Sequence, residues 1–386
     1  MSHRGTGWAW AGLVASSVAL GIVGLAVAPA VWAQNPPAKG KASARGARGK
    51  VVKGVEAPPR KAPNAADPLG VGAAKEKGKE KGKEPDDASF HYRLKIRSGE
   101  KIVLAASYYP GKPDTSTPVL LLVHEKDRSG KDFEDPIADL KGKGLAEHFQ
   151  SLGYATLSFD LRGHGANIRK PPSEREWKEM VDDLQTAYLF LLDRHNRGEL
   201  NLAKLGVVAL GEGANLSALW AFLPGGAVSH EGRVTDLAGL VLISPLSSGE
   251  GFNFSTLMNS ISPRIPVLLM AGERDLLSHE TVKRVRANVE RTRLNRVELF
   301  PSSLHGYKLL RLEPKATSVI EKFLESTVTH KPTEWEPRYN LAPIDYNDIE
   351  VVHHLKPADR EKKEKEKDAA KEKAKGQDAG KAKDQG

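Results

Sequence analysis

Short apolar runs alternate with longer amphipathic segments through the middle of the chain, from residue 90 to residue 327. The runs at 119–123 and 205–210 contain only apolar residues and glycine, which is typical of strands buried on both faces of a sheet. Segment 177–195 instead repeats its apolar residues at helical spacing. This alternation predicts an α/β fold: a mostly parallel, twisted sheet with helices on both faces.

The same pattern places the individual elements. Strands are predicted at 90–97, 101–108, 119–123, 154–160, 205–210, 237–243, 267–270 and 297–300. Helices are predicted at 145–152, 177–195, 214–222, 279–293 and 315–327. Sheets of this type place their sites at the carboxyl ends of the strands, so the residues that follow each strand are the candidates for chemistry.

The flanks differ in composition from this central domain, which is expected over 89–330. Residues 34–88 and 356–386 are rich in charged residues and poor in the apolar residues that a core needs. We therefore predict a disordered linker and a disordered tail. Residues 331–355 include Trp335 and Ile344, and this extension is predicted to pack on the outside of the domain.

The net charge of +9 belongs to the flanks, because residues 89–355 contain 33 basic and 34 acidic residues. A near-neutral domain gives no support for specific nucleic-acid binding. The basic tails are expected to contact anionic surfaces, such as a cell-wall polymer or lipid headgroups, or to be solvated without any partner.

The first residues have the features of an export signal. His3 and Arg4 precede an uncharged stretch at 5–33, and Val31 and Ala33 are suitable small or short residues before a cleavage site. We predict a cleaved signal peptide over 1–33; the alternative is an uncleaved membrane anchor formed by 5–33. Both place the domain outside the cytoplasm, in the periplasm, in the cell envelope or in the medium.

The loop after the strand at 154–160 reads Asp160-Leu161-Arg162-Gly163-His164-Gly165. This motif resembles the α/β-hydrolase superfamily, whose members include esterases, lipases and dienelactone hydrolases. The resemblance implies an α/β-hydrolase fold, with Asp160 and Arg162 bonding within the loop. The segments where a cap usually enters, 166–177 and 244–265, are short, so a minimal cap is expected.

The same resemblance locates the nucleophile turn, which normally carries serine between two small residues after the fifth strand. With Gly211 aligned to the first small residue, Gly213 stands at the serine position. The backbone N–H groups of Ala214 and Glu125 are the corresponding oxyanion-hole donors. His124-Glu125 resembles the dienelactone-hydrolase type of loop, in which His124 is expected to brace the chain.

The other two triad positions match the family. Asp275 follows the strand at 267–270 in a Gly-x-x-Asp segment, and His305 follows the strand at 297–300 in a His-Gly segment. The order nucleophile, acid, histidine is the order of the family. The resemblance therefore implies that Asp275 orients His305.

No metal or cofactor is expected. The chain has no cysteine, so disulfides, thiolate nucleophiles and Cys-ligated zinc are excluded. The histidines are scattered, and His353 and His354 have no carboxylates at ligand spacing. Gly211-Glu212-Gly213 lacks the spacing of a phosphate-binding loop.

Three functions follow as hypotheses. The first is a non-catalytic binding or scaffold module of the cell envelope, with a small-molecule or envelope ligand of unknown identity. The alternative is an active hydrolase of ester, lipid or peptide bonds that uses His305 and Asp275 with water or a displaced nucleophile. The third is an adhesin that acts through its tails. The oligomeric state is left open.

Overall fold

The computed structural model describes residue 69 and residues 90–98, 102–167, 174–223, 236–249, 252–338 and 342–355. The predicted signal peptide, the C-terminal tail and all of the linker except Leu69 lie outside these ranges. Among the helices of the described residues, none has the length and apolar character needed to cross a membrane.

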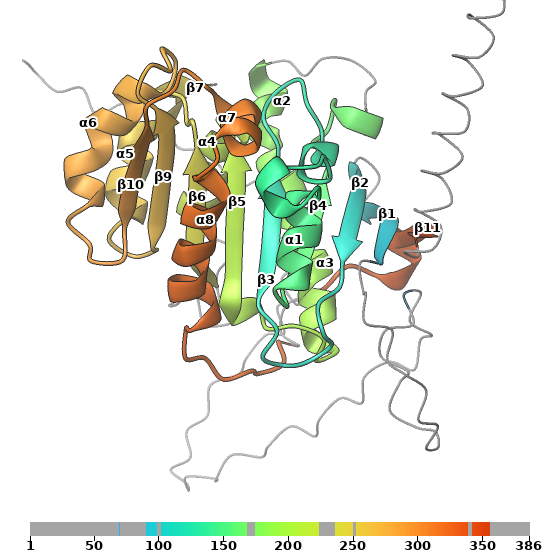
Figure 1. Cartoon of the computed structure of the whole chain (residues 1–386). Coiled ribbons are helices and arrows are strands. Elements are labelled where there is room, and N and C mark those ends of the chain that lie inside the picture. Colours follow the sequence, from blue (N-terminus) through green and yellow to red (C-terminus); the bar gives the residue numbers. More distant parts are fainter. Residues whose placement is uncertain are drawn as a thin grey trace, which may run out of the picture. The chain divides into compact units, whose positions relative to one another are not determined.

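A nine-stranded sheet forms the centre, with the order β10-β9-β6-β5-β3-β4-β2-β1-β11 (Figure 1). The strands are β1 (His91–Ser98), β2 (Ile102–Tyr109), β3 (Val119–Val123), β4 (Ala155–Phe159), β5 (Leu205–Leu210), β6 (Leu237–Ile243), β9 (Val267–Gly272), β10 (Arg296–Phe300) and β11 (Ile349–Leu355). The strands from β4 to β10 in this order run parallel to one another, and β2, β1 and β11 pair antiparallel. This mostly parallel sheet confirms the predicted fold class.

Helices cover both faces of the sheet (Figure 1). One face carries α1 (Leu145–Ser151), α7 (Gly306–Leu312) and α8 (Ala316–Leu324). The other carries α2 (Glu174–Glu179), α3 (Val181–Asn196), α4 (Gly211–Phe222), α5 (Phe254–Ile261) and α6 (His279–Val289). This is the arrangement of the α/β-hydrolase fold.

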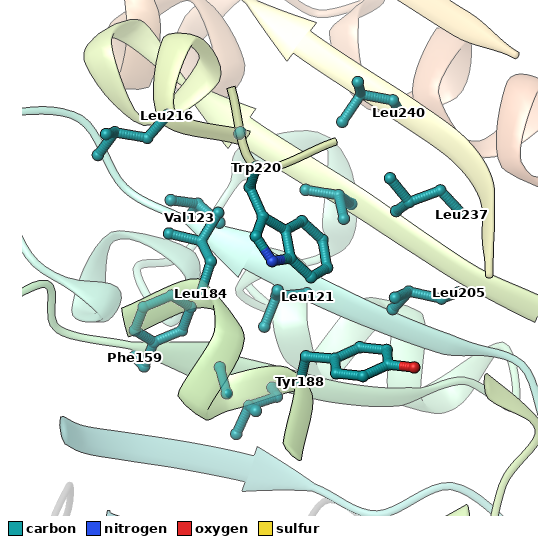
Figure 2. Close-up of a cluster of buried hydrophobic side chains, with 14 of the residues drawn as sticks. Leu121, Val123, Phe159, Leu184, Tyr188, Leu205, Leu216, Trp220, Leu237 and Leu240 are labelled. Carbon is teal, nitrogen blue, oxygen red and sulfur yellow. The ribbon is translucent and has the colours of Figure 1, made fainter. Parts of the chain in front are cut away.

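The apolar core divides between the two faces because side chains alternate along each strand. In β3, Leu121 and Val123 join the cluster under α3 and α4, whereas Leu120 and Leu122 join the cluster under α1 and α8. Figure 2 shows the first cluster, where Trp220 of α4 packs among side chains of the strands and of α3. Its indole N–H donates to the Gln185 side chain at 3.0 Å, so this buried polar group is satisfied.

The predicted elements agree with the structure in position. Helices α5 and α7 and strands β7 (Ser248–Gly249), β8 (Phe252–Asn253) and β11 were not predicted, and the helix predicted at 177–195 is divided into α2 and α3. Helix α4 begins at Gly211 rather than at residue 214. The earlier start of α4 moves the nucleophile turn to a different residue from the one predicted. The described part of 244–265 forms a two-stranded ribbon of β7 and β8, followed by α5, which lies beside α4 and α6.

The C-terminal extension is part of the sheet. Strand β11 pairs with β1, and Ile349 is buried at this edge. Before β11, the Trp335 indole N–H donates to the His195 carbonyl at 3.1 Å, and Arg338 forms a buried ion pair with Asp236. The linker also reaches the domain at Leu69, which is buried and whose carbonyl accepts from the Tyr92 hydroxyl at 2.9 Å.

Arg338→Ala tests how the extension is held. The Tyr188 hydroxyl also donates to Asp236, at 2.6 Å, but within the described ranges Arg338 is the cation that forms an ion pair with this buried carboxylate. Removing one partner of a buried ion pair costs about 3–5 kcal/mol, and urea unfolding should report a loss of that order. Lys95→Ala, which breaks an exposed pair to Glu350, is the control and should cost far less. Equal losses would show that the buried pair has no special role.

Candidate active site

The sequence-predicted residues meet at the carboxyl ends of neighbouring parallel strands. Glu125 follows β3, Gly211 follows β5, Asp275 follows β9 and His305 follows β10. These strands are adjacent in the sheet except for β6, which lies between β5 and β9. The topology therefore gathers four segments that are far apart in the chain.

Asp275 and His305 form the expected pair. His305 Nδ1 lies 2.7 Å from Asp275 Oδ2, and the carboxylate is buried. Asp275 also accepts from the Ser278 hydroxyl and from the Leu277 backbone N–H. Burial opposes ionisation of Asp275, but the bonds from Ser278 and His305 outweigh it and lower the pKa of this carboxyl. The pair fixes the orientation of His305 and leaves its Nε2 directed away from Asp275.

The structure corrects the position of the nucleophile turn from Gly213 to Gly211. Gly211 has a φ of +50°, and a Cβ built on it would lie 3.7 Å from His305 Nε2. Gly213 lies within the first turn of α4, and its Cβ would instead collide with the His124 carbonyl oxygen. A side chain at residue 211 would therefore face His305.

The error arose from the predicted start of α4 at residue 214. With the helix beginning at Gly211, the pattern of small residues becomes Ala209-Leu210-Gly211-Glu212-Gly213, centred on Gly211. The assignment of Ala214 as an oxyanion donor shifts with it, since the residue that follows the turn is Glu212. This spacing was present in the sequence and was the signal that could have identified Gly211.

The Glu125 side chain lies beside the space that a side chain at residue 211 would fill. Its Cβ and Oε2 lie 2.8 Å and 3.1 Å from the Cβ that residue 211 would carry. Oε2 accepts from the Tyr307 backbone N–H at 3.2 Å, and Oε1 lies 3.8 Å from Arg128 Nε. Burial raises the pKa of Glu125, while the Tyr307 N–H and the charges of His305 and Arg128 oppose this change.

A second carboxylate lies on the other side of the turn. Glu212 Oε2 accepts from the Lys126 backbone N–H at 3.3 Å. Lys126 follows Glu125, whose own backbone N–H is the expected oxyanion donor of this loop. The neighbouring N–H of Lys126 is thus bound to a carboxylate of the chain itself, and the charge of Glu212 contributes to the raised pKa of Glu125.

His124 braces the loop, as expected. Its Nδ1 lies 2.7 Å from the Glu125 carbonyl oxygen and its Nε2 accepts from the Leu161 backbone N–H at 3.0 Å, which fixes the neutral tautomer with the proton on Nδ1. Complete burial lowers the pKa of His124 to about 3. A fully buried, neutral imidazole with both nitrogens occupied has a structural role.

The Asp160–Gly165 loop is held differently from the expectation. Asp160 accepts from the backbone N–H groups of Ala166 and Gly130, at 2.7 Å and 2.8 Å. Arg162, predicted to bond within the loop, instead reaches α3, where its Nε and Nη2 donate to Asp183 Oδ1 at 2.8 Å and 2.6 Å. The loop is therefore tied to a helix by a charge-assisted fork.

The described ranges contain no group of three or more His, Asp or Glu side chains arranged to hold a metal ion. The arrangement offers an oriented imidazole, two carboxylates and no nucleophilic side chain at the turn. It can accept or donate a proton at His305, but it has no group at residue 211 that would form a covalent acyl intermediate.

Several solved structures are similar to this chain. An esterase of Pyrococcus furiosus is 19% identical, with 64% of this chain and 96% of that chain covered and a TM-score of 0.47. Esterase 2 of Thermogutta terrifontis is 15% identical over 64% of this chain and 98% of its own, with a TM-score of 0.47. An acylaminoacyl peptidase of Pyrococcus horikoshii is 12% identical over 64% and 43%, with a TM-score of 0.46. No family model and no curated protein matches the chain.

His124→Asn tests the neutral state of the brace through acid stability. Unfolded His124 binds a proton near pH 6.5 and folded His124 only near pH 3, so its stabilising effect is complete above pH 6.5 and is lost as the pH falls toward 3. Replacement by Asn should make the free energy of unfolding fall less steeply as the pH decreases, by up to about 1.4 kcal/mol per pH unit. Replacing the exposed His330 is the control. An unchanged slope in His124→Asn would contradict the buried neutral assignment.

Proposed function

We propose that this α/β-hydrolase-fold protein is a non-catalytic binding or scaffold module. The observation that carries the proposal is the absence of a side chain at Gly211, whose Cβ direction faces His305 Nε2. Covalent catalysis by this fold requires a nucleophilic oxygen or sulfur at that point. Loss of one triad member lowers turnover by several orders of magnitude, even where the other two remain assembled.

The charges around the turn also oppose acyl transfer. An oxyanion is stabilised by free hydrogen-bond donors and by positive potential. Here the Glu125 carboxyl lies beside residue 211, and the Glu212 carboxylate is bound to the loop that carries Glu125. Developing negative charge would meet two acidic side chains, so the transition state would be destabilised relative to the ground state.

The proposed place of action is the cell envelope or the extracellular space. The export-like segment at 1–33 and the basic flanks support this proposal, since the folded domain itself is near neutral. The domain would bind a small-molecule or envelope ligand, while the tails would contact anionic surfaces.

The alternative is a hydrolase that uses water. The Asp275–His305 pair, at 2.7 Å, favours this alternative, because an oriented imidazole can activate a water molecule. In such an enzyme Glu125 would act beside His305 as an acid or base. Activity would then depend on His305 in the unmodified chain.

Ester hydrolysis by the full chain separates the two functions. The unmodified protein and His305→Ala should hydrolyse p-nitrophenyl acetate and butyrate at the same background rate. The double variant Gly211→Ser, Glu125→Gly supplies the nucleophile and removes the Cβ that lies 2.8 Å from the new side chain. It should gain activity of at least about tenfold over background, since triad residues contribute much larger factors in natural enzymes.

Two controls define the result. Adding His305→Ala to the double variant should abolish the gain, and Gly213→Ser should produce none because its side chain would point at the His124 carbonyl. His305-dependent turnover by the unmodified chain would overturn the non-catalytic proposal in favour of the water mechanism.

A further inference from the structure

Two glycines make room for the Glu125 side chain. Gly211 ends the turn after β5, and a Cβ there would lie 2.8 Å from Glu125 Cβ and 3.1 Å from its Oε2. Gly306 follows His305, and a Cβ there would overlap Glu125 Oε2 outright. Both glycines have positive φ, +50° and +47°, so both positions are already unfavourable for other residues. The carboxyl group thus lies in a space bounded by two segments that are distant in sequence.

The contacts of this carboxyl connect three loops. Glu125 itself belongs to the loop after β3, and its Oε2 accepts from the Tyr307 N–H in the segment that carries His305. Its Oε1 lies 3.8 Å from Arg128, whose guanidinium is in turn paired with Asp132 and stacked on the Tyr307 ring, 3.6 Å from its centroid. Among the described residues, the backbone N–H of Tyr307 is the hydrogen-bond donor to the Glu125 carboxyl, and it is the principal anchor of this side chain.

We propose that Glu125 is a positioning residue that acts as an internal carboxylate ligand: it holds the His305 segment to the loop after β3 and occupies the space beside Gly211 in place of the missing nucleophile. In an enzyme of this geometry, a side chain at residue 211 would stand beside His305 Nε2. Here the Glu125 carboxyl stands beside that point and bonds to the next segment instead. This positioning role of Glu125 does not depend on whether the protein turns over a substrate.

A chemical class of ligand follows from the proposal. When the Glu125 side chain is removed, the space between Gly211 and Gly306 and the Tyr307 N–H remain, with the Arg128 guanidinium and the His305 imidazole nearby. That space should accept a small carboxylate from solution, such as acetate, in the place of the side chain. Two further acidic groups lie near this space: Glu212, whose charge contributes to the raised pKa of Glu125, and Asp275, which lies behind His305.

Hydrogen exchange measured by mass spectrometry on the full chain tests this proposal at residues 303–310. Glu125→Gly should exchange about fivefold faster there, because the bond to the Tyr307 N–H is lost. Sodium acetate at tens of millimolar should restore protection in this variant and leave the unmodified protein unchanged, and sodium chloride at equal ionic strength should have no effect. Glu125→Gln, which keeps an acceptor oxygen, should exchange like the unmodified protein. Glu212→Ala is the matched control and should not affect this segment.

Unchanged exchange in Glu125→Gly, or an equal response to acetate and chloride, would overturn the proposal. A thermodynamic cycle covers the case in which Glu125→Gly is poorly folded. Gly306→Ala should destabilise the unmodified chain more than it destabilises Glu125→Ala, because the overlap with Oε2 is then absent. Equal costs in the two backgrounds would show that Glu125 does not occupy the space beside Gly306. None of these readouts depends on turnover, so they stand apart from the ester assay.

Discussion

The structure of the site depends on one constraint, the absence of a side chain where β5 turns into α4. Gly211 adopts a left-handed φ at this turn, and its empty Cβ direction faces His305. Because residue 211 has no side chain, the Glu125 side chain can extend from the loop after β3 into the space beside it. Glu125 in turn reaches the Tyr307 N–H and links the loop to the segment that carries the histidine. A nucleophile and this carboxylate would compete for the same space, since their Cβ atoms would be 2.8 Å apart.

Without a nucleophile at residue 211, the Asp275–His305 pair has a different role. In a serine hydrolase the pair exists to receive a proton from the nucleophile. Here the same hydrogen bond, together with the buried Ser278 hydroxyl on Asp275, orients an imidazole beside a carboxyl group. The hydrolase fold supplies the sheet edge on which these groups meet, but the fold alone does not determine whether the site performs chemistry.

Much of the fold was predictable because buried parallel strands leave wholly apolar runs, as in β3 and β5. Asp275 and His305 were predictable because the Gly-x-x-Asp and His-Gly segments that carry them follow the strands predicted at 267–270 and 297–300. Gly211 was missed when α4 was predicted to begin at residue 214, which shifted the turn by two positions. The roles of Glu125 and Glu212 were not predictable, because they depend on contacts between loops that only the folded sheet brings together. Strand β11 was missed because its pairing partner, β1, lies at the opposite end of the domain sequence.

The most direct test of the central claim is whether any side chain of the chain is a reactive nucleophile. A fluorophosphonate forms a covalent phosphonyl adduct with an activated serine, and intact-mass measurement of the full chain would detect it. The account predicts no adduct on the unmodified protein, and stoichiometric labelling of the Gly211→Ser, Glu125→Gly variant at residue 211. A stoichiometric, His305-dependent adduct on the unmodified chain would contradict it and would identify a displaced nucleophile.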